Sequence, residues 1–137
     1  MTILLDTNII MDVLQERLPF VDDALKILEL GREKKITCFF TANAAADIFY
    51  IYSKARGRKA ANDALSFVLN TLDVVQIGKE DCLKALALPN EDFEDSLVEV
   101  CAKKIGADYV VSRDDEFIAT ATEVKVVKPD ELFTIIQ

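Results

Sequence analysis

Four aspartates have the residue type and the placement to act together in chemistry: Asp6, Asp47, Asp95 and Asp114. Each stands at the carboxyl end of a predicted strand or in the first turns of the helix that follows. In open α/β sheets the carboxyl ends of the parallel strands lie side by side, and ligand crevices form there. We therefore expect these four side chains to gather in one pocket.

The expected chemistry is that of a divalent-metal site. Carboxylates at close range raise one another's pKa unless a cation bridges them. The chain has no histidine, which excludes a histidine base, a Ser–His or Cys–His nucleophile and a His-containing zinc site, and its three scattered cysteines do not supply a zinc tetrad. Oxygen ligands without histidine or cysteine favour Mg²⁺ or Mn²⁺.

Most of these aspartates also have a structural interpretation as helix caps. Asp6 can cap the helix predicted after it, although either of the next two residues is placed to do so as well. Asp92 and Asp95 form a capping arrangement at the start of another helix, where both carboxylates are favourable. Asp114 can cap the short helical turn that follows it. The joint placement, rather than any single residue, favours the metal site.

Asp47 is the most informative of the four. It has no lysine or arginine at helical spacing until Lys54. A partly buried carboxylate without a cationic partner costs several kcal/mol or becomes protonated, and a metal ion would remove that cost. The alternative is that Asp47 faces solvent and needs no partner.

The elements that must position these residues alternate along the chain. Short apolar or β-branched runs predict five strands, at Ile3–Leu5, Ile36–Phe40, Asp73–Ile77, Tyr109–Val111 and Lys125–Val127. Helical spacing predicts the intervening helices, at Ile9–Glu16, Phe20–Lys34, Thr41–Ala55, Lys59–Asn70, Glu80–Leu88, Asp92–Ile105 and Asp114–Ala121, with a last one from Pro129. This alternation predicts an α/β fold of three layers, with a mainly parallel sheet of about five strands between helices.

Size and composition agree with one globular domain over residues 1–137. Apolar residues make up 51% and charged residues 29% of the chain. No stretch resembles a signal peptide or approaches the ~20 apolar residues of a membrane span. We therefore expect a cytoplasmic protein with three buried, reduced cysteines, Cys38, Cys82 and Cys101. The net charge of −8 argues against a nucleic-acid partner only until metal ions load the acidic cluster.

Three sequence stretches resemble the PIN domain family. They are Leu4-Leu5-Asp6-Thr7-Asn8-Ile9-Ile10, Asp92-Phe93-Glu94-Asp95-Ser96-Leu97, and Gly106 to Asp114 followed by Phe117. The resemblance covers nearly the whole chain and is closest to the small bacterial members, which include VapC-like toxins of toxin–antitoxin pairs. It implies a Mg²⁺- or Mn²⁺-dependent endoribonuclease with RNA as its substrate, a possible antitoxin partner and a homodimer.

The resemblance also implies roles for individual residues. Asp6, Asp95 and Asp114 would bind metal, and Asp47 stands where the family usually has Glu. Being one methylene shorter, Asp47 is expected to reach a cation only through water. The positions that would orient these carboxylates or the water are Thr7, Asn8 and Ser112, with Asp92 as a secondary acid.

Basic and aromatic residues suggest where a substrate or partner could bind. Lys54, Arg56, Arg58 and Lys59 could hold RNA phosphates or simply form a solvated corner between two helices. Arg113 could contact phosphate or pair with a carboxylate. The aromatic residues Phe39, Phe40, Phe49, Tyr50 and Tyr52 are expected to lie mostly in the core, with an exposed edge that would suit a dimer or an antitoxin helix.

Two other functions are compatible with a strand-end aspartate. The first is a PIN-fold interaction module with weak or no catalysis, which the Asp at position 47 and the acidic composition allow. The second, a carboxylate-nucleophile phosphatase or phosphoacceptor, fits less well because Asn8 stands where a second aspartate is needed.

Overall fold

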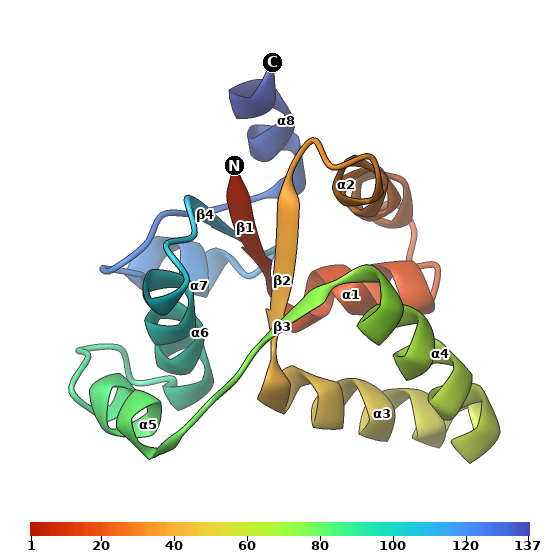
Figure 1. Ribbon diagram of the computed structural model, residues 1–137, viewed down its shortest axis with the longest axis horizontal. Helices are drawn as coiled ribbons and strands as arrows, with labels where there is room; N and C mark the ends of the chain where they lie inside the picture. Colours follow the sequence, from red (N-terminus) through yellow and green to blue (C-terminus); the bar gives the residue numbers. More distant parts are fainter.

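The computed structural model describes residues 1–137 and places five strands in one sheet. All neighbouring strands pair in parallel, in the order β3-β2-β1-β4-β5. The strands are β1 Thr2–Leu5, β2 Thr37–Thr41, β3 Asp73–Val75, β4 Tyr109–Val111 and β5 Val126–Val127. Eight helices connect and flank them: α1 Thr7–Leu14, α2 Val21–Arg32, α3 Ala42–Arg56, α4 Arg58–Thr71, α5 Lys79–Leu86, α6 Phe93–Lys104, α7 Asp115–Thr120 and α8 Pro129–Ile136. The predicted α/β class and parallel five-stranded sheet are confirmed (Figure 1).

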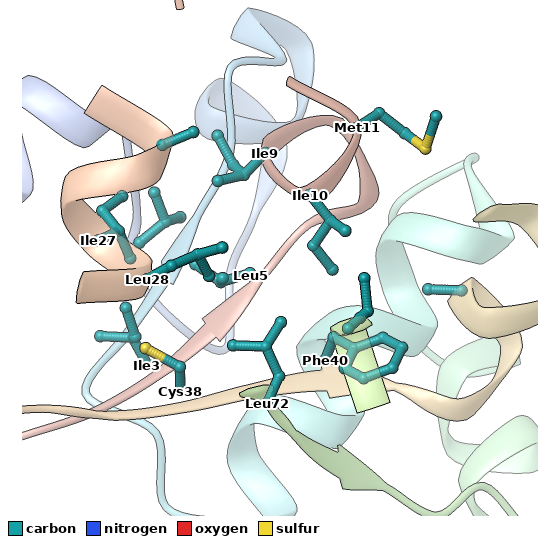
Figure 2. Packing of buried hydrophobic residues seen from close by; sticks show 14 of the residues in the cluster. Ile3, Leu5, Ile9, Ile10, Met11, Ile27, Leu28, Cys38, Phe40 and Leu72 are labelled. Carbon is teal, nitrogen blue, oxygen red and sulfur yellow. The ribbon is translucent and has the colours of Figure 1, made fainter. Parts of the chain in front are cut away.

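The central strand β1 is buried on both faces, as its unbroken apolar run predicts. Its side chains alternate between two cores: Ile3 and Leu5 belong to the larger one, and Leu4 belongs to the other. The larger core also contains Ile9 and Ile10 of α1, and Figure 2 shows these side chains together with those from α2 and β2. The second core contains Phe117 and residues of α6. The sheet is therefore the middle of three layers.

The edges of the sheet are shorter than predicted. The run Asp73–Ile77 predicts five strand residues, but β3 ends at Val75 because its neighbour β2 offers pairing partners only from Phe39 to Thr41. β5 is likewise reduced to Val126–Val127, which pair with Val110 and Val111. The other predicted boundaries differ from the observed ones by two residues or fewer.

The N-caps of α1 and α3 agree with the predictions only in part. Helix α1 begins at Thr7, and its N-cap is Asp6 rather than Thr7 or Asn8, because the extended backbone of Asp6 brings its carboxylate onto the Thr7 N–H. Thr41 is the N-cap of α3, as predicted, but its side chain makes no capping hydrogen bond.

The cysteines are free, and two of the three are buried. Burial, with a smaller effect from Asp73, raises the pKa of the Cys38 thiol to about 12. Burial likewise raises the pKa of Cys101 to about 11, with a smaller effect from Asp81. Cys82 is only half-buried, so the prediction of three buried thiols is wrong there, because its position on α5 lies at the margin of a small outer core. None of the helices has the length and apolar character that crossing a bilayer requires.

Candidate active site

An open cleft of about 440 Å³ lies where the chain passes from β1 into α1, next to the starts of α3, α6 and α7. Six of its ten lining residues are acidic, and none is a lysine or arginine. The lining residues are Asp6, Thr7, Asn8, Asp47, Tyr50, Ile51, Asp92, Glu94, Asp95 and Asp114. All four aspartates that the sequence singles out therefore lie in one cleft.

Asp6 combines the two interpretations that its sequence position allows. Its Oδ1 accepts a hydrogen bond of 2.9 Å from the backbone N–H of Thr7 and so caps α1. Its Oδ2 accepts one of 2.8 Å from the Ser112 hydroxyl, which is fully buried. The side-chain amide of Asn8 lies 3.4 Å from the same oxygen and 3.1 Å from the Ser112 hydroxyl oxygen. Both carboxylate oxygens are thus held in position by hydrogen bonds.

The pairing of β1 with β4 brings Ser112 to Asp6 across more than 100 residues of sequence. The backbone N–H of Asp6 donates to the carbonyl of Val111 at 2.9 Å, which continues the strand pairing one residue past Leu5. Ser112 follows Val111 directly, so the two strand ends present their side chains together. The structure therefore places the Ser112 hydroxyl within hydrogen-bonding distance of the Asp6 carboxylate.

Asp92 and Asp114 are helix caps that also line the cleft. Asp92 Oδ1 accepts from the Asp95 N–H at 3.1 Å, as the capping interpretation predicts. Asp114 Oδ1 accepts from the Glu116 N–H at 3.0 Å and from the Phe117 N–H at 3.5 Å. A cap uses one oxygen of the carboxylate for these bonds, and the other oxygen remains available for a ligand.

Burial raises the pKa of three acids of the cleft, Asp6, Glu94 and Asp95, and neighbouring carboxylates raise it further. Burial is the largest cause of the raised pKa of Asp95, which reaches about 7, and Asp92, Asp6, Asp114 and Glu94 add to it. Burial also raises the pKa of Asp6, although its hydrogen bonds from Ser112 and Thr7 oppose the shift.

Glu94 belongs to this acidic set, although the sequence interpretation assigned it no role. Burial raises its pKa first, followed by Asp47, Asp92 and Asp6, so the effect connects α3 to α6 across the cleft. The signal in the sequence was the run of three acids within four residues at one helix start. Asp47 itself is half-buried in the cleft and forms no ion pair.

The residues fit a hydrated divalent ion better than a fully protein-ligated one. No three acidic or cysteine side chains in the chain are arranged to hold one metal ion between them. Mg²⁺ usually keeps several waters and binds through one or two carboxylates, so this donor set suits it. The six acidic side chains, the lack of a lysine or arginine and the raised pKa values of Asp6, Glu94 and Asp95 are features of a site that attracts a cation.

Arg113 does not face this cleft but anchors the segment that carries Ser112 and Asp114. Its Nε and Nη2 donate to Asp12 Oδ2 and Oδ1 at 2.6 and 2.8 Å, and its guanidinium lies 3.7 Å from the centre of the Phe20 ring. Its backbone N–H donates to Asn8 Oδ1 at 3.2 Å. Of the two roles open to Arg113, the structure shows pairing with a carboxylate. Asp12, fully buried in α1, was missed by the sequence interpretation.

Lys54, Arg56, Arg58 and Lys59 lie outside the cleft, around the turn between α3 and α4. All four are exposed. Of the aromatic residues, Phe40 is in the core, Phe39, Phe49 and Tyr52 are half-buried, and Tyr50 is exposed at the cleft.

Comparison with known proteins decides the family. Residues 2–116 match the PIN domain. The chain belongs to the PIN domain family. It is homologous to ribonuclease VapC1 of Aquifex aeolicus (strain VF5), with 28% identity over 127 residues that cover 89% of this chain and 88% of the relative.

Solved PIN-domain structures share the fold. VapBC2 from Rickettsia felis, bound to a DNA fragment from its promoter, has a TM-score of 0.75 at 18% identity, over 93% of this chain and 98% of the other. Mycobacterium tuberculosis VapC20, a toxin that cleaves the sarcin-ricin loop, has a TM-score of 0.69 at 16% identity, over 89% and 98%. The predicted three-layer PIN fold is therefore confirmed.

Proposed function

We propose that this chain is a Mg²⁺- or Mn²⁺-dependent endoribonuclease that hydrolyses RNA phosphodiester bonds. The observation that supports it most strongly is the single cleft in which six acidic side chains from α3, α6 and the starts of α1 and α7 meet without a lysine or arginine. Homology to ribonuclease VapC1 supports RNA as the substrate.

Within this proposal Asp6 and Asp95 would hold the metal directly, and Asp114 and Asp47 would complete the site or act through water. A bound divalent ion lowers the pKa of a water molecule and offsets the charge that builds on the phosphoryl oxygens. The chain's own contribution is to hold these carboxylates in place. Ser112 and the Thr7 backbone fix the two oxygens of Asp6, and such supporting hydrogen bonds commonly change metal affinity 10- to 100-fold.

The test is RNA cleavage by the purified chain with Mg²⁺ or Mn²⁺, and with EDTA in excess. We expect Asp6→Asn and Asp95→Asn each to lower the rate by at least about 100-fold, because each removes a negative ligand from the ion. Asp63→Asn, an exposed aspartate of α4 without an ion-pair partner, is the matched control and should keep the wild-type rate. Cleavage that survives both active-site substitutions, or that EDTA leaves unchanged, contradicts the proposal.

We also propose that the ribonuclease is the toxin of a toxin–antitoxin pair. VapBC complexes among the structural neighbours support this role, including one described as a toxin–antitoxin complex from Klebsiella pneumoniae. Expression of the wild-type chain should arrest growth, expression of Asp6→Asn should not, and co-expression of a small protein encoded beside it should restore growth. Equal growth with the wild type and Asp6→Asn would remove the toxin role.

A second candidate is an interaction module that keeps the fold without catalysis. The shorter Asp47 side chain and the net charge of −8 favour it. Calorimetry separates the two functions, since a metal-dependent enzyme must bind Mg²⁺ or Mn²⁺ and a scaffold need not.

A further inference from the structure

One face of α3 leads from the carboxylate cleft to an unpaired group of cations. Asp47, Tyr50, Ile51 and Lys54 occupy positions i, i+3, i+4 and i+7 of α3, so they lie on the same side of the helix. The first three line the cleft. Lys54 comes next, about 10 Å from Asp47 along the helix axis. In Figure 1, α3 extends from below the sheet to the corner where it meets α4.

The cations at the far end of this face form what we call the cationic corner, which consists of Lys54, Arg56, Arg58 and Lys59. Gly57 lies between them with φ of +89°, a conformation that favours glycine, and it lets α3 and α4 bring their cations to one turn. Nine of the sixteen lysines and arginines form ion pairs. Four of the remaining seven are the residues of this corner.

The lack of ion pairs at all four of its cations distinguishes the cationic corner from an ordinary solvated turn. In a chain with eight more negative than positive charges, carboxylates are plentiful, yet none pairs with the corner. A group of unpaired cations is the electrostatic feature that binds phosphates. The corner therefore suits an anionic polymer with regularly spaced phosphates, such as RNA.

Tyr50 lies between the carboxylates and the cationic corner. Its side chain is 61% exposed, although it is a large aromatic residue, and the Lys54 Nζ lies 5.1 Å from the centre of its ring. Exposed aromatic rings beside cations are the platforms on which proteins stack the bases of single-stranded nucleic acids. Bases inside a duplex are already stacked on one another and are not free to do this.

We propose that this face of α3 binds an unpaired RNA strand, with one base stacked on Tyr50 and the neighbouring phosphates on the cationic corner. The inference rests on the proposed function for what occupies the carboxylate cleft, where the scissile bond of the same strand would lie. It adds the path of the strand, which runs from the carboxylate cleft along α3 toward the turn into α4.

The test measures binding without cleavage. In the Asp6→Asn background, with Mg²⁺ present, a fluorescent RNA oligonucleotide is titrated as a single strand and as a duplex of the same sequence. Arg56→Gln/Lys59→Gln removes two charges from the corner, and Arg32→Gln/Lys79→Gln removes the same two residue types from exposed positions elsewhere. Thermal melting of each variant checks that it is folded.

We expect the corner variant to reduce the slope of log K against log salt by about 1.4, because each lost phosphate contact on a single strand contributes about 0.7. The control should keep the slope of its parent. Tyr50→Leu should weaken binding of the single strand roughly tenfold with little change in slope, since base stacking carries no charge. The duplex should bind more weakly than the single strand and should not respond to Tyr50→Leu.

Equal salt slopes for the corner variant and its control overturn the inference, as does an equal loss of duplex binding in Tyr50→Leu. Absence of any RNA binding by folded protein overturns it as well. The proposed function fails separately: if the wild type shows the expected binding pattern but no metal-dependent cleavage, the RNA-binding face is supported and the nuclease is not.

Discussion

The ion pair between Asp12 and Arg113 should respond unequally to the loss of its two members. Asp12 lies in α1 with its side chain 1% exposed, and Arg113 reaches it from the segment between β4 and α7 with its side chain 24% exposed. The two hydrogen bonds of 2.6 and 2.8 Å make it a bidentate pair. The only other cation near Asp12 is Arg17, whose Nη1 lies 3.7 Å from Oδ1.

Arg113→Ala leaves the buried Asp12 carboxylate with Arg17 as its one remaining cationic partner, at 3.7 Å. Removal of one member of a buried pair costs about 3–5 kcal/mol of unfolding free energy, and we expect a loss in this range. Asp12→Ala leaves a guanidinium that still stacks on Phe20 and can reach water. We therefore expect a smaller loss, of about 1–3 kcal/mol.

Urea unfolding measures both losses through the midpoint and the slope of the transition. The double variant should lose less than the sum of the single losses, because no charge is left buried in it. Arg113→Lys should lie between wild type and Arg113→Ala, since it keeps the charge without the bidentate geometry. If Asp12→Ala costs as much as Arg113→Ala, the unequal burial of the two groups does not control the energetics and the reasoning is refuted.

Three further predictions concern the carboxylate cleft. In the metal-free protein the pKa of Asp95 is raised from 3.8 to about 7, so between these values the folded state holds a proton that the unfolded state releases. The free energy of unfolding should therefore fall by about 1–2 kcal/mol from pH 4 to pH 7, allowing for the partial exposure of Asp95. Urea unfolding at several pH values should show that Asp95→Asn removes most of this pH dependence. Ser112→Ala removes the hydroxyl that donates to Asp6 and should lower Mg²⁺ affinity about tenfold by calorimetry; unchanged affinity would count against its orienting role. Asp47→Glu should bind Mg²⁺ at least as tightly as wild type, because the longer side chain reaches further into the cleft, whereas Asp47→Asn should bind more weakly; the opposite order in the same titration would contradict an ion within reach of this position.

The sheet and the placement of the aspartates follow from local sequence patterns. The run Ile3–Leu5 can only be buried on both faces, and a parallel strand ending in Asp6 puts that carboxylate beside the end of the next strand. Asp92 and Asp114 occupy helix starts that their residue type favours, so both caps were predictable. A carboxylate that caps a helix at a strand end is already near the cleft, so the structural and functional interpretations were not exclusive.

The features that could not be predicted depend on contacts between distant parts of the chain. Nothing local distinguishes Asp12 from an exposed aspartate of a short helix, because its burial depends on Arg113, about 100 residues later. The end of β3 at Val75 depends on how far its partner β2 extends, which the residues of β3 do not encode. The exposure of Tyr50 beside its half-buried neighbours likewise depends on what packs against α3.

The most direct test of the divalent-metal site is a titration of Mn²⁺ into the apo protein, in which electron paramagnetic resonance measures the concentration of free Mn²⁺. Wild type should remove Mn²⁺ from solution, Asp6→Asn and Asp95→Asn should bind it at least about tenfold more weakly, and Asp63→Asn should match wild type. Wild-type protein that binds no Mn²⁺, or an Asp6→Asn variant that binds it as tightly as wild type, would contradict the assignment of this cleft as a metal centre.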